Sequence, residues 1–174
     1  MAQTVLELFR PRSVIDVGCG DGSLLYEMQL RGVRCVGIDG SVWAIREAAK
    51  RGIDVRQMDL RAPSIEGAGG PYDLALCLEV AEHLPPEYAE GLVQFISQLS
   101  QLVVFSAAQP GQGGEGHLNE QPPEYWEKPF NRSGFVKNID LTTQLRDRWA
   151  DSAVPSFYRK NVQCFQATNL KVDM

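Results

Sequence analysis

Long apolar runs are absent from this chain of 174 residues, and no stretch approaches the roughly 18 residues that a membrane-spanning helix requires. No cationic segment precedes an apolar run near the start, so the sequence indicates no secretory signal. Cysteine is scarce, and Cys19, Cys35, Cys77 and Cys164 form no CxxC pair. Single cysteines in or beside apolar segments are typical of packed, reduced thiols. We therefore expect a cytoplasmic protein with no membrane segment.

Positive charge is the second shortage, with 17 Lys and Arg against 22 Asp and Glu and a formal net charge of −5. Proteins that bind duplex nucleic acid usually present a cluster of cations to the phosphates. The acidic balance therefore argues against long nucleic acid as a partner. The length, with 44% hydrophobic residues, predicts a single domain over residues 1–174. Nothing in the residues indicates an oligomeric state.

The first half of the chain alternates β-branched runs with amphipathic segments, and this pattern predicts a parallel sheet flanked by helices. Five strands are expected, over residues 14–17, 33–38, 53–57, 72–78 and 101–106. The run over 72–78 is almost continuously apolar, which indicates a strand buried on both faces. The predicted fold class is therefore α/β, Rossmann-like and doubly wound.

The helices between these strands follow from capping residues and helical spacing. Ser41 is expected to cap a helix that turns Val42, Ile45, Ala48 and Ala49 toward the core. Pro85 and Pro86 are expected to open another helix. The tail adds a short helix containing Tyr125 and Trp126, a strand near Phe135, a helix over 141–150 and a last strand over 161–167.

A glycine-rich turn over residues 16–22 joins the first strand to the first helix. Its glycines allow positive φ and let a ligand approach the backbone closely. A dinucleotide fingerprint would place glycine where Ser23 stands, and Asp16 and Asp21 would repel a pyrophosphate. These acids instead suit a ligand with positive charge, such as S-adenosylmethionine, which carries a sulfonium and an α-ammonium group.

Two further acids end neighbouring strands. Asp39 closes the second strand, 19 residues after Gly20, and is placed to accept hydrogen bonds from both ribose hydroxyls of a nucleoside. Asp59 follows the third strand and is placed to accept a hydrogen bond from the adenine amino group. Together with the glycine turn, these acids predict a nucleoside-binding edge of the sheet.

Four motifs in order carry a resemblance to the class I S-adenosylmethionine-dependent methyltransferases. They are VIDVGCGDG over 14–22, GID over 37–39, MDL over 58–60 and LCLEVAEH over 76–83. The resemblance covers essentially the whole chain and implies a seven-stranded, mostly parallel sheet whose last strand is antiparallel. It also implies cofactor contacts at Asp16, Gly18, Gly20, Asp39, Asp59, Leu60 and Leu78, the last two through their backbones.

Ligands of open parallel sheets bind outside the carboxyl ends of the strands, which selects the loops over 79–86 and 107–121. The chain has two histidines, and His83 falls in the first of these loops and His117 in the second. Both are therefore candidate general bases for the proton of an acceptor. The glycine-dense segment over 111–116 is expected to be mobile and to close over the acceptor, bringing His117 toward the methyl group.

The string EVAEH over 79–83 suggests a metal as a further possibility. Residues at i, i+3 and i+4 of a helical turn project to one side, so Glu79, Glu82, His83 and the later His117 are candidate ligands of one divalent ion. The string resembles the metal site of the small-RNA 3′-terminal 2′-O-methyltransferases, and a related string occurs in ubiquinone-pathway O-methyltransferases. The alternative is that Glu79 lies near the adenosyl group, Glu82 is solvated, and His83 orients or deprotonates a hydroxyl.

The function predicted from the resemblance is methyl transfer from S-adenosylmethionine to a small-molecule acceptor, with oxygen favoured over nitrogen. A first alternative is RNA 3′-end 2′-O-methylation, which the acidic charge and the lack of a basic or aromatic strand-binding tract disfavour. A second alternative is a non-catalytic cofactor-binding subunit that serves a larger enzyme.

Overall fold

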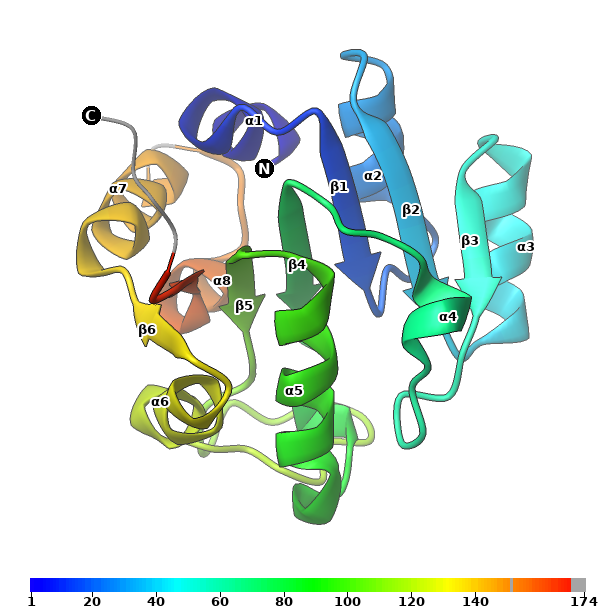
Figure 1. Cartoon of the computed structure of the whole chain (residues 1–174). Coiled ribbons are helices and arrows are strands. Elements are labelled where there is room, and N and C mark those ends of the chain that lie inside the picture. Colours follow the sequence, from blue (N-terminus) through cyan, green and yellow to red (C-terminus); the bar gives the residue numbers. More distant parts are fainter. Residues whose placement is uncertain (151, 170–174) are drawn as a thin grey trace.

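A computed structural model describes residues 1–150 and 152–169 of the chain (Figure 1). Helices and strands alternate through the first two thirds, as the hydrophobic pattern predicts. The elements in chain order are α1 (Ala2–Phe9), β1 (Ser13–Val17), α2 (Ser23–Gln29), β2 (Arg34–Asp39), α3 (Val42–Lys50), β3 (Asp54–Gln57), α4 (Ile65–Ala68), β4 (Leu74–Leu78), η1 (Ala81–His83), η2 (Pro86–Tyr88), α5 (Ala89–Leu99), β5 (Leu102–Ser106), α6 (Pro123–Arg132), β6 (Phe135–Lys137), α7 (Ile139–Ala150), α8 (Ser156–Asn161) and β7 (Gln163–Ala167).

The strands form one seven-stranded sheet in the order β3-β2-β1-β4-β5-β7-β6. Strands β1 to β5 are parallel, whereas β7 is antiparallel to both β5 and β6. All five residues of β1 are buried, and four of the five in β4 are, because helices cover both faces of a parallel sheet. The expected α/β class, with its antiparallel last strand, is confirmed.

Two helical layers enclose the sheet, one on each face (Figure 1). On one face, α4, α5 and α6 contribute Ala68, Leu92 and Phe130 to a core with Phe105 and Phe165 of the sheet. On the other face, α1, α2, α3 and α7 form the second core with β1, β2 and β4. The central strands therefore lie between two apolar layers, which leaves the strand ends as the places where polar groups can gather.

Three local features differ from the sequence expectations. Helices α1 and α8 lie where no element was expected, and the last strand begins at Gln163 because Asn161 ends α8. In α3, Ala48 is buried as expected, but the second buried residue is Ala44, whereas Ala49 is exposed and Val42 is 50% exposed. The expectation for Val42 was wrong because the small alanines let α3 pack closely on β2 and β3, which rotates Val42 toward solvent.

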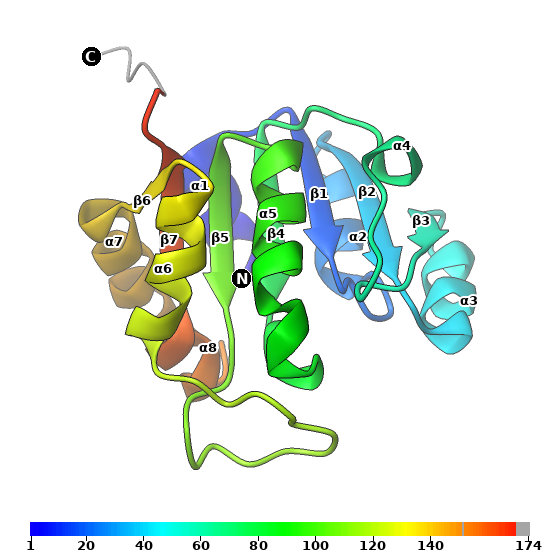
Figure 2. The same ribbon diagram turned by 60° about the horizontal axis from the view of Figure 1, so that its bottom comes forward.

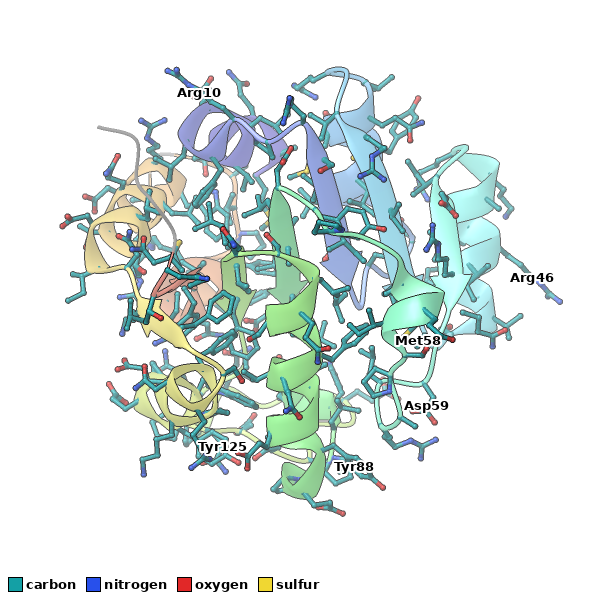
Figure 3. All side chains as sticks on the ribbon, in the orientation of Figure 1. Arg10, Arg46, Met58, Asp59, Tyr88 and Tyr125 are labelled. Carbon is teal, nitrogen blue, oxygen red and sulfur yellow. The ribbon has the colours of Figure 1, made fainter. Side chains whose placement is uncertain are left out.

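The carboxyl ends of the parallel strands gather the loops that carry the polar motifs. Figure 3 shows Met58 and Asp59 after β3, and Tyr88 before α5, at this edge, while Arg10 lies at the opposite edge. The segment over 107–122 leaves β5 as a long excursion from the same edge (Figure 2), and α8 lies beside the end of β5 in both ribbon views. Within the described residues, none of the helices has the length and apolar character needed to cross a bilayer.

Candidate active site

The glycine turn brings β1 against the loop that follows β4. Gly18 adopts φ +80° and donates its N–H to the Ile38 carbonyl oxygen at 2.7 Å. A side chain at Gly18 would collide with the Val80 side chain. Glycine is therefore required here both for the backbone conformation and for the close approach of the two loops.

Asp39 organises the next turn. One of its carboxylate oxygens accepts the Gly20 N–H at 2.9 Å, and the other accepts the Ser41 N–H at 2.8 Å. Each oxygen keeps a second lone pair, because a carboxylate oxygen can accept about two hydrogen bonds. Asp39 can therefore hold the glycine turn and still accept hydrogen bonds from a ligand.

A cavity of about 580 Å³ opens at this edge, a size within the range of small-molecule sites. Four of the predicted cofactor residues line it: Gly18, Asp39, Asp59 and Leu60. Of the other three, Leu78 directly precedes the lining residue Glu79, and Asp16 and Gly20 each lie two residues from Gly18 in the chain. Its remaining wall includes Glu79 and His83, so the cavity joins the predicted cofactor edge to the loop after β4.

Asp59 is engaged by its neighbour Arg61. The Arg61 guanidinium donates to both carboxylate oxygens, at 2.6 to 3.0 Å, and both side chains are more than half exposed. This hydrogen bonding lowers the pKa of Asp59 to about 2. Asp59 is thus an ionised acid at the open end of the cavity, with its charge already balanced by Arg61.

Asp16 has no cationic side chain paired with it among the described residues. It is 5% exposed, and burial, followed by the negative charge of Asp39, raises its pKa to about 7. No Lys, Arg or His side chain forms an ion pair with Asp16, Asp39 or Glu79 within residues 1–150 and 152–169. The cavity therefore has an excess of negative charge at its β1, β2 and β4 side, which favours a cationic ligand.

Glu79 stands immediately after β4 in a left-handed conformation, with φ +56°. Non-glycine residues rarely adopt this region unless the surroundings hold them there. The Glu79 N–H donates to both the carbonyl and the hydroxyl of Ser106, and its carboxylate accepts hydrogen bonds from Asn161 and Gln112. Donors from α8 and from the loop after β5 therefore hold the Glu79 carboxylate, while Glu79 also lines the cavity.

Glu82 is fully buried, so the alternative expectation that it is solvated was wrong. Neither carboxylate oxygen has a hydrogen-bond partner of good geometry among the described residues. Burial raises the pKa of Glu82 to about 7, although nearby backbone N–H groups, including that of Ala108, partly oppose this shift. Glu82 lies in the 3-10 turn η1, and the loop over 117–119 covers this turn. The Leu118 and Asn119 N–H groups fix the loop there, because both donate to the Glu82 carbonyl oxygen.

The two histidines meet at the cavity, with ring centroids 5.0 Å apart. One ligand atom from each of Glu82, His83 and His117 lies within 4.8 Å of the others, whereas Glu79 is not in this group. His83 Nδ1 lies 3.3 Å from the Gly116 carbonyl oxygen. A carbonyl oxygen only accepts, so Nδ1 carries the proton in this bond and Nε2 keeps a free lone pair.

Glu120 binds the glycine-dense loop over 111–116 and the adjoining His117 through hydrogen bonds. Its carboxylate accepts the N–H groups of Gly111 and Gly113, each at 2.8 Å, and pairs with His117 Nδ1 at 2.9 Å. The His117 bond and these two amides hold the pKa of Glu120 below its usual range. A side chain at Gly114 would collide with the His117 ring. The mobility expected for this loop stays a prediction, but the loop already places His117 beside His83.

Sequence reasoning missed three residues that shape this site: Gln112, Glu120 and Asn161. Each acts through contacts with residues distant in the chain or with backbone amides of a loop. Local spacing carries no signal for Gln112 or Asn161. Glu120 had one usable signal, because a metal-binding histidine commonly donates its second ring N–H to a carboxylate, and His117 is a candidate metal ligand.

The whole chain, residues 1–174, matches the family described as "Methyltransferase domain". The chain therefore belongs to this methyltransferase family, and the resemblance to the class I S-adenosylmethionine-dependent enzymes is confirmed. A ubiquinone biosynthesis O-methyltransferase of Bordetella parapertussis is 34% identical over 79 residues, which cover 42% of this chain and 33% of the relative. The matched part thus spans about a third of that relative's length.

Two solved structures show the same fold. The sugar N-methyltransferase KedS8 of Streptoalloteichus superimposes with a TM-score of 0.70 at 15% identity, covering 95% of this chain and 84% of that one. The magnesium protoporphyrin IX methyltransferase of Synechocystis, crystallised with bound S-adenosylmethionine, superimposes with a TM-score of 0.66 at 21% identity, covering 94% and 73%. At these identities the likeness concerns the fold.

The raised pKa of Asp16 predicts a pH-dependent stability. Between about pH 4 and pH 7 the folded chain keeps the Asp16 proton and the unfolded chain loses it, so the free energy of unfolding falls as the pH rises through this range. We expect Asp16→Asn, without ligand, to be more stable than the native chain by roughly 4 kcal/mol at pH 8 and equally stable near pH 4. Urea unfolding at a series of pH values measures the difference.

Asp54→Asn is the matched control, because Asp54 lies exposed at the sheet edge beside Arg56. This control should follow the native pH profile. Parallel profiles for Asp16→Asn and the native chain would show that Asp16 is not held protonated by burial.

Proposed function

We propose that the chain is an S-adenosylmethionine-dependent methyltransferase that acts on a small-molecule acceptor, with transfer to oxygen favoured. The cavity with its unbalanced carboxylates carries the proposal, because it fits a nucleoside that bears a positive charge. When bound, S-adenosylmethionine supplies a methyl group activated by its sulfonium. The residues of the chain then have to hold the two reactants and receive a proton.

The proposed cofactor contacts follow the order of the strands. Asp59 and Leu60, after β3, would meet the adenine, and Asp39, after β2, would accept the ribose hydroxyls. Gly18 and Gly20, after β1, would let the backbone approach the cofactor, while Asp16 would supply negative charge below it. The free lone pairs of Asp39 and the space that only glycine leaves at position 18 support this arrangement.

His83 is the proposed general base. Transfer to a hydroxyl oxygen releases a proton, and the free lone pair on His83 Nε2 can receive it. His83 lines the cavity and is exposed, so an acceptor has access to it. The O-methyltransferase among the relatives supports oxygen as the acceptor atom. His117, beside His83, is proposed to orient the acceptor.

A cytoplasmic location is part of this proposal. All four cysteines are free thiols in the buried interior. Unpaired thiols are usual in a reducing compartment, and a metabolite methyltransferase would find its cofactor there.

The reaction is tested by product detection. The purified chain is incubated with methyl-labelled S-adenosylmethionine and a panel of small phenols, sugars and amines, with short RNA as a separate arm. We expect labelled product from a hydroxylated small molecule and none from RNA. Label in RNA alone would favour the RNA-end alternative, and cofactor binding without product in any arm would favour a non-catalytic subunit.

Cofactor binding is tested at Asp39. Asp39→Ala removes the acceptor for the ribose and also the support of the Gly20 and Ser41 N–H groups. We expect calorimetry to show S-adenosylmethionine binding weakened by about 2 to 4 kcal/mol, roughly 30- to 1,000-fold. Asp54→Ala, at the exposed edge of β3, should bind normally. Unchanged affinity in a folded Asp39→Ala protein would remove Asp39 from the site.

As the alternative to His83 as a free base, we propose a divalent metal at Glu82, His83 and His117, in which the His83 Nε2 lone pair would bind the ion. The buried Glu82 carboxylate without a hydrogen-bond partner supports a metal, since such a group is costly unless a cation compensates it. One carboxylate and two imidazoles suit ions such as manganese, iron or zinc. When bound, the ion would polarise the acceptor oxygen. Glu79 is left out of the proposed ligands because Asn161 and Gln112 bind its carboxylate.

Direct metal titration tests this site. Chelator-treated protein should bind manganese or zinc in calorimetry with one site per chain, and Glu82→Gln should weaken binding at least tenfold because it removes the only buried charged ligand. Glu87→Gln, an exposed glutamate of the neighbouring turn, is the control. Full methyl transfer in metal-free buffer, with Glu82→Gln active and His83→Ala inactive, would leave His83 as a base without a metal.

A further inference from the structure

Asn161 closes a ring of hydrogen bonds at the cavity wall. Its side-chain amide donates to both oxygens of the Glu79 carboxylate at 3.0 Å and to the Gln112 side-chain oxygen at 2.8 Å. Gln112 in turn donates to a Glu79 oxygen at 2.9 Å. The three side chains come from α8, the loop after β4 and the loop after β5.

The orientation of the Asn161 amide is determined by this network. The Asn161 oxygen accepts a hydrogen bond from the Gln109 side chain at 3.1 Å, and a rotated amide would turn that oxygen toward the Glu79 carboxylate. Asn161 is 3% exposed, so water does not compete for its donors. Two features therefore fix the direction of the Glu79 carboxylate: the Asn161 amide and the left-handed backbone conformation of Glu79 itself.

The donors on Glu79 orient its charge without neutralising it. Asn161 and Gln112 are neutral, and Glu79 forms no ion pair within the described part of the chain. Asp59 at the other end of the cavity differs, because Arg61 balances it. Glu79 therefore keeps its negative charge for a ligand at the β4 end of the cavity, and a cation beside it would be stabilised there.

The strand order places this charge against one end of the ligand. Asp59, Asp39, Gly18 and Glu79 follow β3, β2, β1 and β4, which are consecutive in the sheet. If adenine and ribose lie at β3 and β2, the remaining part of the cofactor lies at β1 and β4. That part carries the sulfonium, so Glu79 faces the group that loses its charge when the methyl group leaves.

We propose that Asn161 is a positioning residue that aims the Glu79 carboxylate at the cofactor sulfonium, so that the site distinguishes S-adenosylmethionine from its neutral thioether product. The inference rests on the proposed function. Through Asn161, α8 would help the site to bind S-adenosylmethionine more tightly than the thioether product. The reason is that loss of the sulfonium charge removes the attraction to Glu79.

Calorimetry with two ligands tests the proposal, using S-adenosylmethionine and S-adenosylhomocysteine on the full chain. The two differ in one methyl group and one charge, and both keep the α-ammonium. In Glu79→Gln we expect about tenfold weaker binding of S-adenosylmethionine with binding of the product changed less than threefold. In Asn161→Ala we expect a change of the same kind, three- to tenfold.

Two further variants control for folding. Gln112→Ala removes one donor to Glu79 from an exposed loop position, so it should fold and show a smaller change in the same direction. Arg146→Gln loosens the junction of α8 and β7, because Arg146 donates to the Lys160 and Val162 carbonyls, but it leaves Glu79 untouched. Its preference between the two ligands should equal that of the native chain.

Equal weakening of both ligands in Glu79→Gln would overturn the proposal, since Glu79 would then face the α-ammonium or act only structurally. A changed preference in Glu79→Gln with none in folded Asn161→Ala and Gln112→Ala would overturn the role of Asn161. If the native chain binds neither ligand, the proposed function itself fails, and this result is separate from the other two.

Discussion

The structure depends on one electrostatic constraint: carboxylates lie at the carboxyl ends of β1, β2 and β4 without cations beside them. Parallel strands packed on both faces leave only their ends for polar groups, so acids that end neighbouring strands converge at one edge. Each of them loses hydration there, and each needs a compensating group. The turns, loops and the α8 helix around the cavity can be understood as the ways in which the chain supplies that compensation.

Two kinds of compensation are present, and two of the acids have neither. Asp39 receives backbone N–H groups from the glycine turn and from the start of α3, and these same bonds shape the cavity. Glu79 receives side-chain amides from α8 and the loop after β5. Asp16 and Glu82 receive neither an ion pair nor a well-placed side-chain donor, and burial raises the pKa of each to about 7. A cationic nucleoside beside Asp16 and a divalent ion beside Glu82 would each lower the pKa of the neighbouring acid and favour its ionised form.

The two halves of the chain contribute differently to this site. Residues up to the end of β4 build the proposed cofactor edge with turns in which Asp39 and Asp59 accept hydrogen bonds from backbone amides. Residues after β5 build the proposed acceptor side with long-range contacts, in which Glu120 binds the amides of the glycine-dense loop and that loop places His117 beside His83. We therefore expect the loop over 107–122 and α8 to determine the specificity for the acceptor, and the turns after β1, β2 and β3 to determine the binding of the cofactor.

The sequence by itself determined the strands, the glycine turn and the acids Asp39 and Asp59, because these features arise from local backbone preferences and from the regular spacing of parallel units. It also placed both histidines at one edge. Only the tertiary structure decided that Glu82 is buried, that Val42 faces solvent, and that Glu79 turns to Asn161, a residue 82 positions away. Burial and hydrogen-bond partners of this kind depend on which loops the closed sheet brings together, and short-range spacing does not encode them.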